Sequence, residues 1–300
     1  MSVLAPLHAF GALFAAQRHG LKSFGLLTAP NLMPIYRTPT AIRETAHRAA
    51  FRGAALDDPP APMTDPARTF LGDYIFEWDH VLELFPPWFD AFPFERLPHS
   101  LQGTFPNETS ARAIPEVEAF AVAGERPWVF FSGSGGGILK VQPRLFEMAA
   151  EVCQRTGRRG IMLDPLAGGA VEPMGDGVIR SGLTNLNALL PMARGFFHHG
   201  GIGSTSQALA AAVPHVIAPV GFDQPGNAAW IARKGLGVQL DSRALTLDAM
   251  EAALAAAEQL PTAPRRELAE RLRREDGARG LAALIAGRVA APVRQEAEPA

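Results

Sequence analysis

Short apolar runs alternate with amphipathic stretches along the second half of the chain. Each apolar run has the length of a buried strand. The predicted strands after Pro127 cover residues 128–131, 160–163, 178–179, 195–198, 215–218 and 237–240. Helical patterns cover residues 143–155, 187–193, 204–212, 247–259, 265–274 and 278–289, with one more helix ending before Gly235. This alternation predicts an α/β fold with a doubly wound parallel sheet.

The first 125 residues show a weaker pattern. Helices are predicted at residues 7–18 and 41–56 and a strand at 23–27, whereas the proline-rich stretch 57–68 is typical of an exposed loop. The aromatic stretch 70–94 could be helical. Its rings either line an apolar ligand pocket or, as is more common, fill the core of a small domain.

The change of pattern predicts two domains, and the chain of 300 residues with 47% hydrophobic content is long enough for both. We expect a smaller α/β domain over residues 1–125, a larger one over 126–290 and a solvated tail over 291–300.

Candidate chemistry is concentrated in residues 196–230. The glycines between residues 200 and 203 follow a predicted strand and permit close approach of a ligand to the backbone. Ser204 and Gln207 have the spacing of a capping box, which predicts a helix that begins at Ser204. A helix N-terminus carries unpaired N–H groups and partial positive charge, so the loop predicts a phosphate site.

Polar side chains follow the next predicted strand, at residues 215–218. Asp223, Gln224 and Asn227 lie where ligands bind in parallel sheets, beyond the carboxyl end of a strand. A carboxylate and two amides are suitable partners for sugar hydroxyls. The segment therefore predicts a site for a phosphorylated sugar.

The order of these residues resembles the donor-site signature of the UDP-glycosyltransferase superfamily. Members of this superfamily are nucleotide-sugar glycosyltransferases of the Rossmann-like GT-B architecture. The likeness is greatest to bacterial enzymes that glycosylate lipids, sterols or macrolides. The matching residues are His198-His199-Gly200-Gly201-Ile202-Gly203-Ser204, Gln207, Ala208-Leu209, Val213-Pro214 and Asp223-Gln224-Pro225-Gly226-Asn227-Ala228.

Three positions depart from the family pattern. Ser204 replaces the usual Thr and keeps the hydroxyl, and Gln207 replaces the Glu of plant relatives, so a ribose contact would be neutral. Ala212 replaces the usual Gly before Val-Pro. If the backbone there is left-handed, Ala costs about 1 kcal/mol.

The resemblance implies an inverting hexosyltransferase that uses a UDP- or dTDP-sugar as co-substrate, needs no metal, and acts on an apolar acceptor such as a lipid, sterol or polyketide. By resemblance, His199 donates to the diphosphate, Gln207 meets the ribose, and Asp223 and Gln224 hold the sugar. The full set of implied donor-binding residues is Gly133, Ser134, His199, Gly200, Gly201, Gly203, Ser204, Gln207, Asp223, Gln224 and Asn227.

The resemblance also implies an N-terminally truncated chain, because only the second half of the usual acceptor domain has a counterpart. The family's catalytic base lies in the missing part, and none of the eight histidines matches it. We therefore assign no catalytic residue. We interpret His198 as a strand-end packing residue, and His8, His19, His47, His80 and His99 as surface or structural residues.

Charge, cysteine content and hydrophobic pattern bear on whether the chain binds nucleic acid, contains disulfides or crosses a membrane. A formal charge of −2 gives no case for nucleic acid, and the single Cys153 excludes an internal disulfide, as expected for a cytoplasmic enzyme. No apolar stretch is long enough to span a membrane, although peripheral membrane contact stays open. The sequence indicates no oligomeric state.

Two other functions fit less well. The glycine loop 132–137 fails as a dinucleotide fingerprint because Ile138 stands where Gly is needed, which disfavours an NAD-dependent dehydrogenase. The paired His198 and His199 lack further ligands at metal-binding spacing. The main alternative is a non-catalytic nucleotide-sugar-binding protein or partner subunit.

Overall fold

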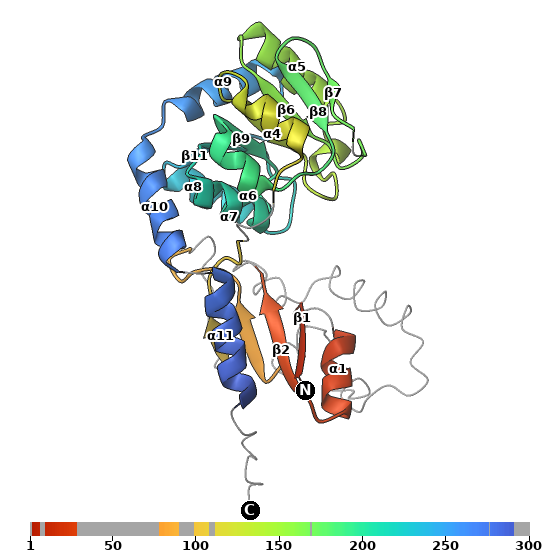
Figure 1. Ribbon diagram of the computed structural model, residues 1–300, viewed down its shortest axis with the longest axis vertical. Coiled ribbons are helices and arrows are strands. Elements are labelled where there is room, and N and C mark those ends of the chain that lie inside the picture. The colour runs from red at the N-terminus through yellow and green to blue at the C-terminus, as the bar shows by residue number, and fades with distance from the viewer. Residues whose placement is uncertain are drawn as a thin grey trace, which may run out of the picture. The chain divides into compact units, whose positions relative to one another are not determined.

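The computed structural model describes residues 2–6, 10–28, 78–89, 99–107, 112–168, 170–275 and 277–290 (Figure 1). The chain forms two compact units, one of residues 1–106 and 277–300 and the other of residues 107–276. The predicted helix at 41–56, the loop at 57–68, the tail at 291–300, His8 and His47 lie outside the described residues.

The second unit contains a seven-stranded sheet in the order β11-β10-β9-β5-β6-β8-β7. All neighbours in it are parallel except β7 and β8. The strands are β5 (Trp128–Phe131), β6 (Gly160–Leu163), β7 (Glu172–Pro173), β8 (Val178–Ser181), β9 (Gly195–His198), β10 (His215–Ile217) and β11 (Gly237–Gln239). The chain order reverses between β5 and β9, which makes this the switch point where ligands bind in such sheets.

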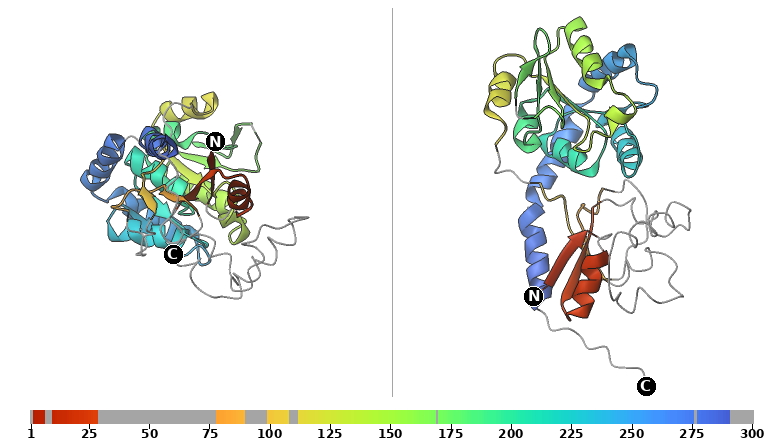
Figure 2. Two further views of the ribbon diagram at one scale, coloured as in Figure 1. Left: turned by 90° about the horizontal axis from the view of Figure 1, so that it is seen from below. Right: turned by 90° about the vertical axis from the view of Figure 1, so that its right-hand side faces the viewer.

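Helices cover both faces of this sheet, as the right-hand view of Figure 2 shows. The helices of the second unit are α4 (Pro115–Val122), α5 (Leu145–Arg155), α6 (Leu186–Leu189), α7 (Ile202–Ala211), α8 (Gln224–Arg233), α9 (Leu247–Glu258) and α10 (Thr262–Arg274), with short 3₁₀ turns at Ile138–Lys140 and Leu190–Met192. The prediction of a doubly wound parallel sheet is confirmed.

The apolar residues of the central strands divide between two cores. In β5, Trp128 and Phe130 pack with residues of α5 and α9, whereas Val129 and Phe131 pack with residues of α4 and α6. Successive side chains of a strand point to opposite faces. A strand covered on both faces is therefore apolar throughout, which explains why the continuous apolar runs predicted these strands correctly.

The first unit contains a four-stranded parallel sheet in the order β1-β2-β3-β4. Its elements are β1 (Ser2–Pro6), α1 (Phe10–Arg18), β2 (Lys22–Leu27), β3 (His80–Glu83), β4 (Ser100–Gln102) and α11 (Gly277–Ala290). Leu281 of α11 joins Phe24, Leu82 and Leu101 in one core cluster. This packing explains why α11 belongs to the first unit, contrary to the expected domain of residues 126–290.

The aromatic stretch 70–94 is not helical where the structure describes it, because residues 80–83 form β3. Trp78, Phe85 and Phe89 are each only 1% exposed. These rings fill the core, as the more common of the two interpretations expects. Among the described residues, no helix is both long and apolar enough to cross a bilayer.

Candidate functional site

The glycine loop between β9 and α7 leads into the N-terminus of α7. The helix begins at Ile202 and its N-cap is Gly201, so the prediction of a start at Ser204 is wrong. Ser204 lies in the first turn instead. The cap comes from a distant residue, because Oδ2 of Asp223 accepts a hydrogen bond of 2.9 Å from the Ile202 N–H. Sequence spacing alone could not reveal a cap supplied from 21 residues away.

Asp223 and Asn227 connect the start of α8 to the glycine loop. The buried Asn227 amide donates to the Gly200 carbonyl and to Oδ2 of Asp223, both at 2.9 Å. Burial raises the pKa of Asp223, and the hydrogen bonds from Ile202 and Asn227 oppose this shift. Two residues predicted to bind the ligand therefore also hold the loop in place.

Gln224 braces its own loop. Its Oε1 accepts hydrogen bonds from the backbone N–H groups of Val220 and Gly221, at 2.8 and 3.2 Å. Among the described residues, the structure records no partner for its Nε2. The amide nitrogen is thus the group of Gln224 that can reach a ligand.

The His199 imidazole lies between two glycines from different loops. A Cβ atom on Gly201 would lie 2.5 Å from its Nε2, and one on Gly133 would lie 3.1 Å from its Cε1. Gly133 also has a φ of 92°, which favours glycine. Nδ1 of His199 is buried and has no hydrogen-bond partner among the residues that the structure describes. Burial lowers the pKa of His199 to about 4. The structure therefore brings the two predicted glycine loops together around a neutral histidine.

His198 has a structural role, as we expected. Its Nδ1 accepts a hydrogen bond of 3.1 Å from the Gly200 N–H, so the ring proton belongs on Nε2. Nε2 lies 3.1 Å from Nδ1 of His215, to which it donates. Both rings are fully buried, and burial lowers the pKa of each. Sequence analysis missed His215 because it is one residue of a short strand with no motif around it.

The remaining predicted residues border the same loops. Apart from the chain neighbours of Gly203 and the nearby backbone of α7, no atom of the described residues lies within 4 Å of a Cβ built on Gly203, so space is open beside the first turn of α7. Ser204 is 6% exposed in that turn, and the half-buried Gln207 follows it along the helix. Ser134 is exposed in the turn after β5.

Several known proteins and one protein family resemble this chain. Residues 160–291 match the family model for the C-terminal domain of erythromycin biosynthesis protein CIII-like proteins. The glycosyltransferase GtfC of Amycolatopsis orientalis is 33% identical over 211 residues, which are 69% of this chain and 48% of GtfC. The chain is similar to a glycosyltransferase over 69% of its length.

Other glycosyltransferases agree with this relationship. The O-mycaminosyltylonolide 6-deoxyallosyltransferase of Streptomyces fradiae is 32% identical over 124 residues, 41% of this chain and 28% of the enzyme. The solved structure of glycosyltransferase VinC in complex with dTDP has the same fold, with a TM-score of 0.65 at 19% identity over 95% of this chain and 71% of VinC. The chain spans about half the length of the curated relatives that it matches, for example 48% of GtfC and 46% of a Mycobacterium bovis protein.

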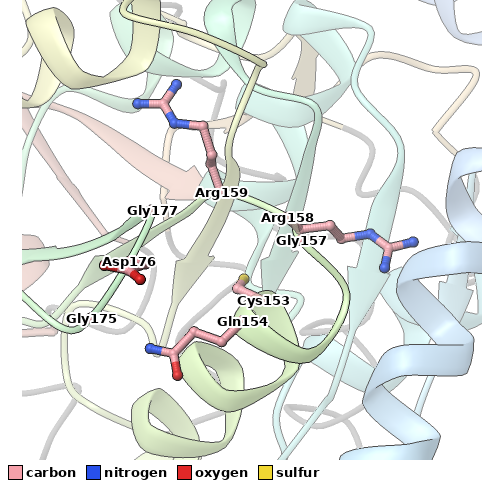
Figure 3. Close-up of a pocket in the computed structure, with 8 residues that line it drawn as sticks. All are labelled: Cys153, Gln154, Gly157, Arg158, Arg159, Gly175, Asp176 and Gly177. Carbon is pink, nitrogen blue, oxygen red and sulfur yellow. The ribbon is translucent and has the colours of Figure 1, made fainter.

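A hollow of about 610 Å³ lies at the amino ends of β6 and β8, whereas the glycine loops lie at the carboxyl edge of the sheet (Figure 3). The side chains of Arg158 and Arg159 point in different directions there. Arg158 pairs with Glu258 at 2.9 Å, and Arg159 donates to the Phe120 carbonyl at 2.6 Å. Since both cations are engaged in the fold, the carboxyl edge is the better candidate site.

Metal ligands are not gathered at either edge within the described part of the chain, where no group of three or more His, Cys, Asp and Glu residues could hold an ion.

Proposed function

We propose that this chain binds a nucleoside-diphosphate sugar at the carboxyl edge of its seven-stranded sheet, and that the protein transfers the hexose to an apolar acceptor. The observation that carries this proposal is the His199 imidazole, with its unpartnered Nδ1, between Gly133 and Gly201 beside the N-terminus of α7. A helix N-terminus and a fixed N–H donor together suit a diphosphate.

The diphosphate contacts follow from the donors that α7 still offers. Asp223 already accepts from the Ile202 N–H, so the phosphates use the open space beside Gly203, the first turn at Ser204 and the His199 ring. His199 is neutral near pH 7 because its pKa is about 4. It therefore acts as a neutral donor to the charge that develops as the diphosphate leaves.

The strand order orients the rest of the donor. β10 and β5 lie on opposite sides of β9. If the diphosphate lies at the end of β9 and the hexose lies beside Asp223 and Gln224, after β10, the nucleoside extends in the opposite direction, over the Gly133-Ser134 turn that follows β5. Gln207, one turn along α7, is then our candidate for the ribose contact. The residues that remain for the hexose are Oδ1 of Asp223 and Nε2 of Gln224.

The relatives favour particular substrates within this class. VinC was solved with dTDP, and the Streptomyces fradiae enzyme is named for transfer of a 6-deoxyhexose to a tylonolide. We therefore infer a dTDP-sugar or UDP-sugar donor and a polyketide-like acceptor, with inversion at the anomeric carbon and without a required metal ion.

Isothermal titration calorimetry of the purified chain with dTDP, UDP and their hexose derivatives tests the binding step. We expect binding of at least one nucleotide in the presence of EDTA, and no binding of NAD. Transfer to a macrolide aglycone, followed by mass spectrometry, tests the reaction. Failure to bind any of these nucleotides would overturn the proposal, whereas binding without donor hydrolysis or transfer would support the non-catalytic alternative.

A further inference from the structure

Phe222 has an unfavourable position in the loop between β10 and α8. Its side chain is 84% exposed, although exposure of a large aromatic ring forgoes the gain from burial. Its backbone also has a φ of 57°, in the left-handed region where glycine fits and a bulky residue is strained. Strain of this kind persists where the surroundings enforce it, and it is concentrated at functional sites.

The loop around Phe222 is tied at both ends. Before it, the Ser242 hydroxyl donates to the Pro219 carbonyl at 2.6 Å, and Gln224 accepts from the backbone of Val220 and Gly221. After it, Asp223 accepts from Ile202 and from the Asn227 amide. The strained backbone of Phe222 is thus fixed from both sides, which places the ring in advance of any ligand.

Some polar atoms beside Phe222 are already engaged within the fold. One carboxylate oxygen of Asp223 and the amide oxygen of Gln224 are already used within the fold. A hollow of about 530 Å³, bounded by Pro219, Gln239, Leu240 and Asp241, opens beside the start of the same loop. A ligand at this loop therefore meets one large aromatic surface beside the polar atoms that remain, Oδ1 of Asp223 and Nε2 of Gln224.

Among the described residues, the other large apolar side chains exposed at the carboxyl edge lie away from Phe222. Leu166 and Leu183 are also exposed at the carboxyl edge, 82% and 48%, but they follow β6 and β8. Two strands separate β10 from β6, so three spacings between neighbouring strands put Leu166 roughly 14 Å farther along the edge. Phe222 therefore does not share one apolar patch with these two leucines.

We propose that Phe222 is a specificity-determining residue that stacks against the apolar C–H face of the donor hexose, and that it favours deoxyhexoses over fully hydroxylated ones. This inference rests on the proposed function. Deoxygenation widens the apolar face of the sugar that the exposed ring can cover. Ligand pockets commonly combine an aromatic surface with a few polar groups in this way.

The test compares Phe222→Gly, Phe222→Tyr and the parent chain in binding to dTDP, dTDP-glucose and a dTDP-6-deoxyhexose by calorimetry. We expect Phe222→Gly to raise the unfolding temperature, because strain is relieved, and to weaken 6-deoxyhexose donor binding about 10-fold while dTDP binding is unchanged. Phe222→Tyr should retain parental affinity. The preference of the parent for the deoxy donor should disappear in Phe222→Gly.

Ala212→Gly is the matched control, since Ala212 has the same left-handed conformation with a φ of 56° but caps the far end of α7. It should raise the unfolding temperature and leave all three affinities unchanged. Parental binding with the same sugar-to-dTDP affinity ratio in Phe222→Gly would overturn this inference alone. If the parent bound none of the three nucleotides, nor UDP and its sugars, the proposed function itself would fail, and this inference with it.

Discussion

His198 and His199 are consecutive residues with opposite surroundings. His198 uses both ring nitrogens inside the fold, toward Gly200 and His215, whereas Nδ1 of His199 is buried without a partner. The sequence predicted this division correctly for His198 through its place at the end of a strand. The role of His199 as a ligand donor remains a prediction. Its ring lies against two glycine loops, and this packing alone does not identify a ligand.

Substitution of His199 by Ala tests that role. Since a hydrogen bond to a charged group contributes about 1.5–3 kcal/mol, we expect the affinity for the nucleoside diphosphate to fall roughly 10- to 100-fold. Calorimetry with dTDP or UDP measures the change. His19→Ala, at an exposed position of the first unit, is the control and should bind as the parent does. Equal affinities of the parent and His199→Ala would exclude the assigned contact.

Ala212 has a left-handed backbone, with φ and ψ of 56° and 26°. This conformation favours glycine, which is the usual residue at the matching position of the family pattern. We expect Ala212→Gly to increase the free energy of unfolding by about 1 kcal/mol, because Cβ is disfavoured there. Ala210→Gly, inside α7, should lower it by roughly 0.5–1 kcal/mol. Urea denaturation measures the free energy of unfolding of both variants. A loss of stability in Ala212→Gly would contradict the claim that the backbone of Ala212 is strained.

At the scale of elements, six of the seven strands of the second unit were predicted, whereas β7 and the start of α7 were not. Apolar runs such as 160–163 coincide with their strands because both faces of the sheet are covered. β1, β3 and β4 escaped prediction, since three to five residues among aromatic or proline-containing segments carry too little periodicity. The start of α7 depends on Asp223, a contact that only the folded chain creates.

The link between α8 and the glycine loop can be tested at Asn227. In Asn227→Asp, a second carboxylate would lie beside Oδ2 of Asp223 and could not donate to the Gly200 carbonyl. We expect the free energy of unfolding to fall by about 1–3 kcal/mol near neutral pH, together with weaker nucleotide binding. The deficit should shrink as the pH falls and the new carboxyl is protonated, whereas the deficit of Asn227→Ala should not follow that protonation. Urea denaturation across pH distinguishes the two, and parallel pH profiles would refute the link.

At the scale of the whole molecule, the sequence predicts two α/β parts but not their membership. The helical pattern of α11 reveals an apolar face without revealing which sheet it covers, and only the contacts of Leu281 place it in the first unit. The candidate site is a product of the same long-range folding. Gly133, His199 and Asp223 follow three different strands, and the doubly wound topology brings those strand ends to one edge.

Burial of three histidines behind that edge makes stability depend on pH. Burial lowers the folded-state pKa values of His198, His199 and His215, to about 4 for His199 and about 3 for His215. The unfolded chain, with histidine pKa values near 6.5, therefore binds more protons below that pH. The free energy of unfolding should fall as the pH decreases from about 6.5, by up to about 1.4 kcal/mol per pH unit for each histidine, and Asp223 with its raised pKa should offset part of this loss.

The substitution His215→Gln tests how much the protonation of one histidine contributes to this pH dependence. The Gln side-chain oxygen can accept from Nε2 of His198 as Nδ1 of His215 does, but it does not titrate. We expect the loss of stability between about pH 6 and about pH 5 to be smaller in this variant by about 1 kcal/mol, because one protonation of the unfolded state is removed. His19→Gln, at an exposed position, should leave that loss as it is in the parent. Urea denaturation at the two pH values measures it, and an unchanged loss in His215→Gln would mean that His215 does not remain neutral in the folded protein.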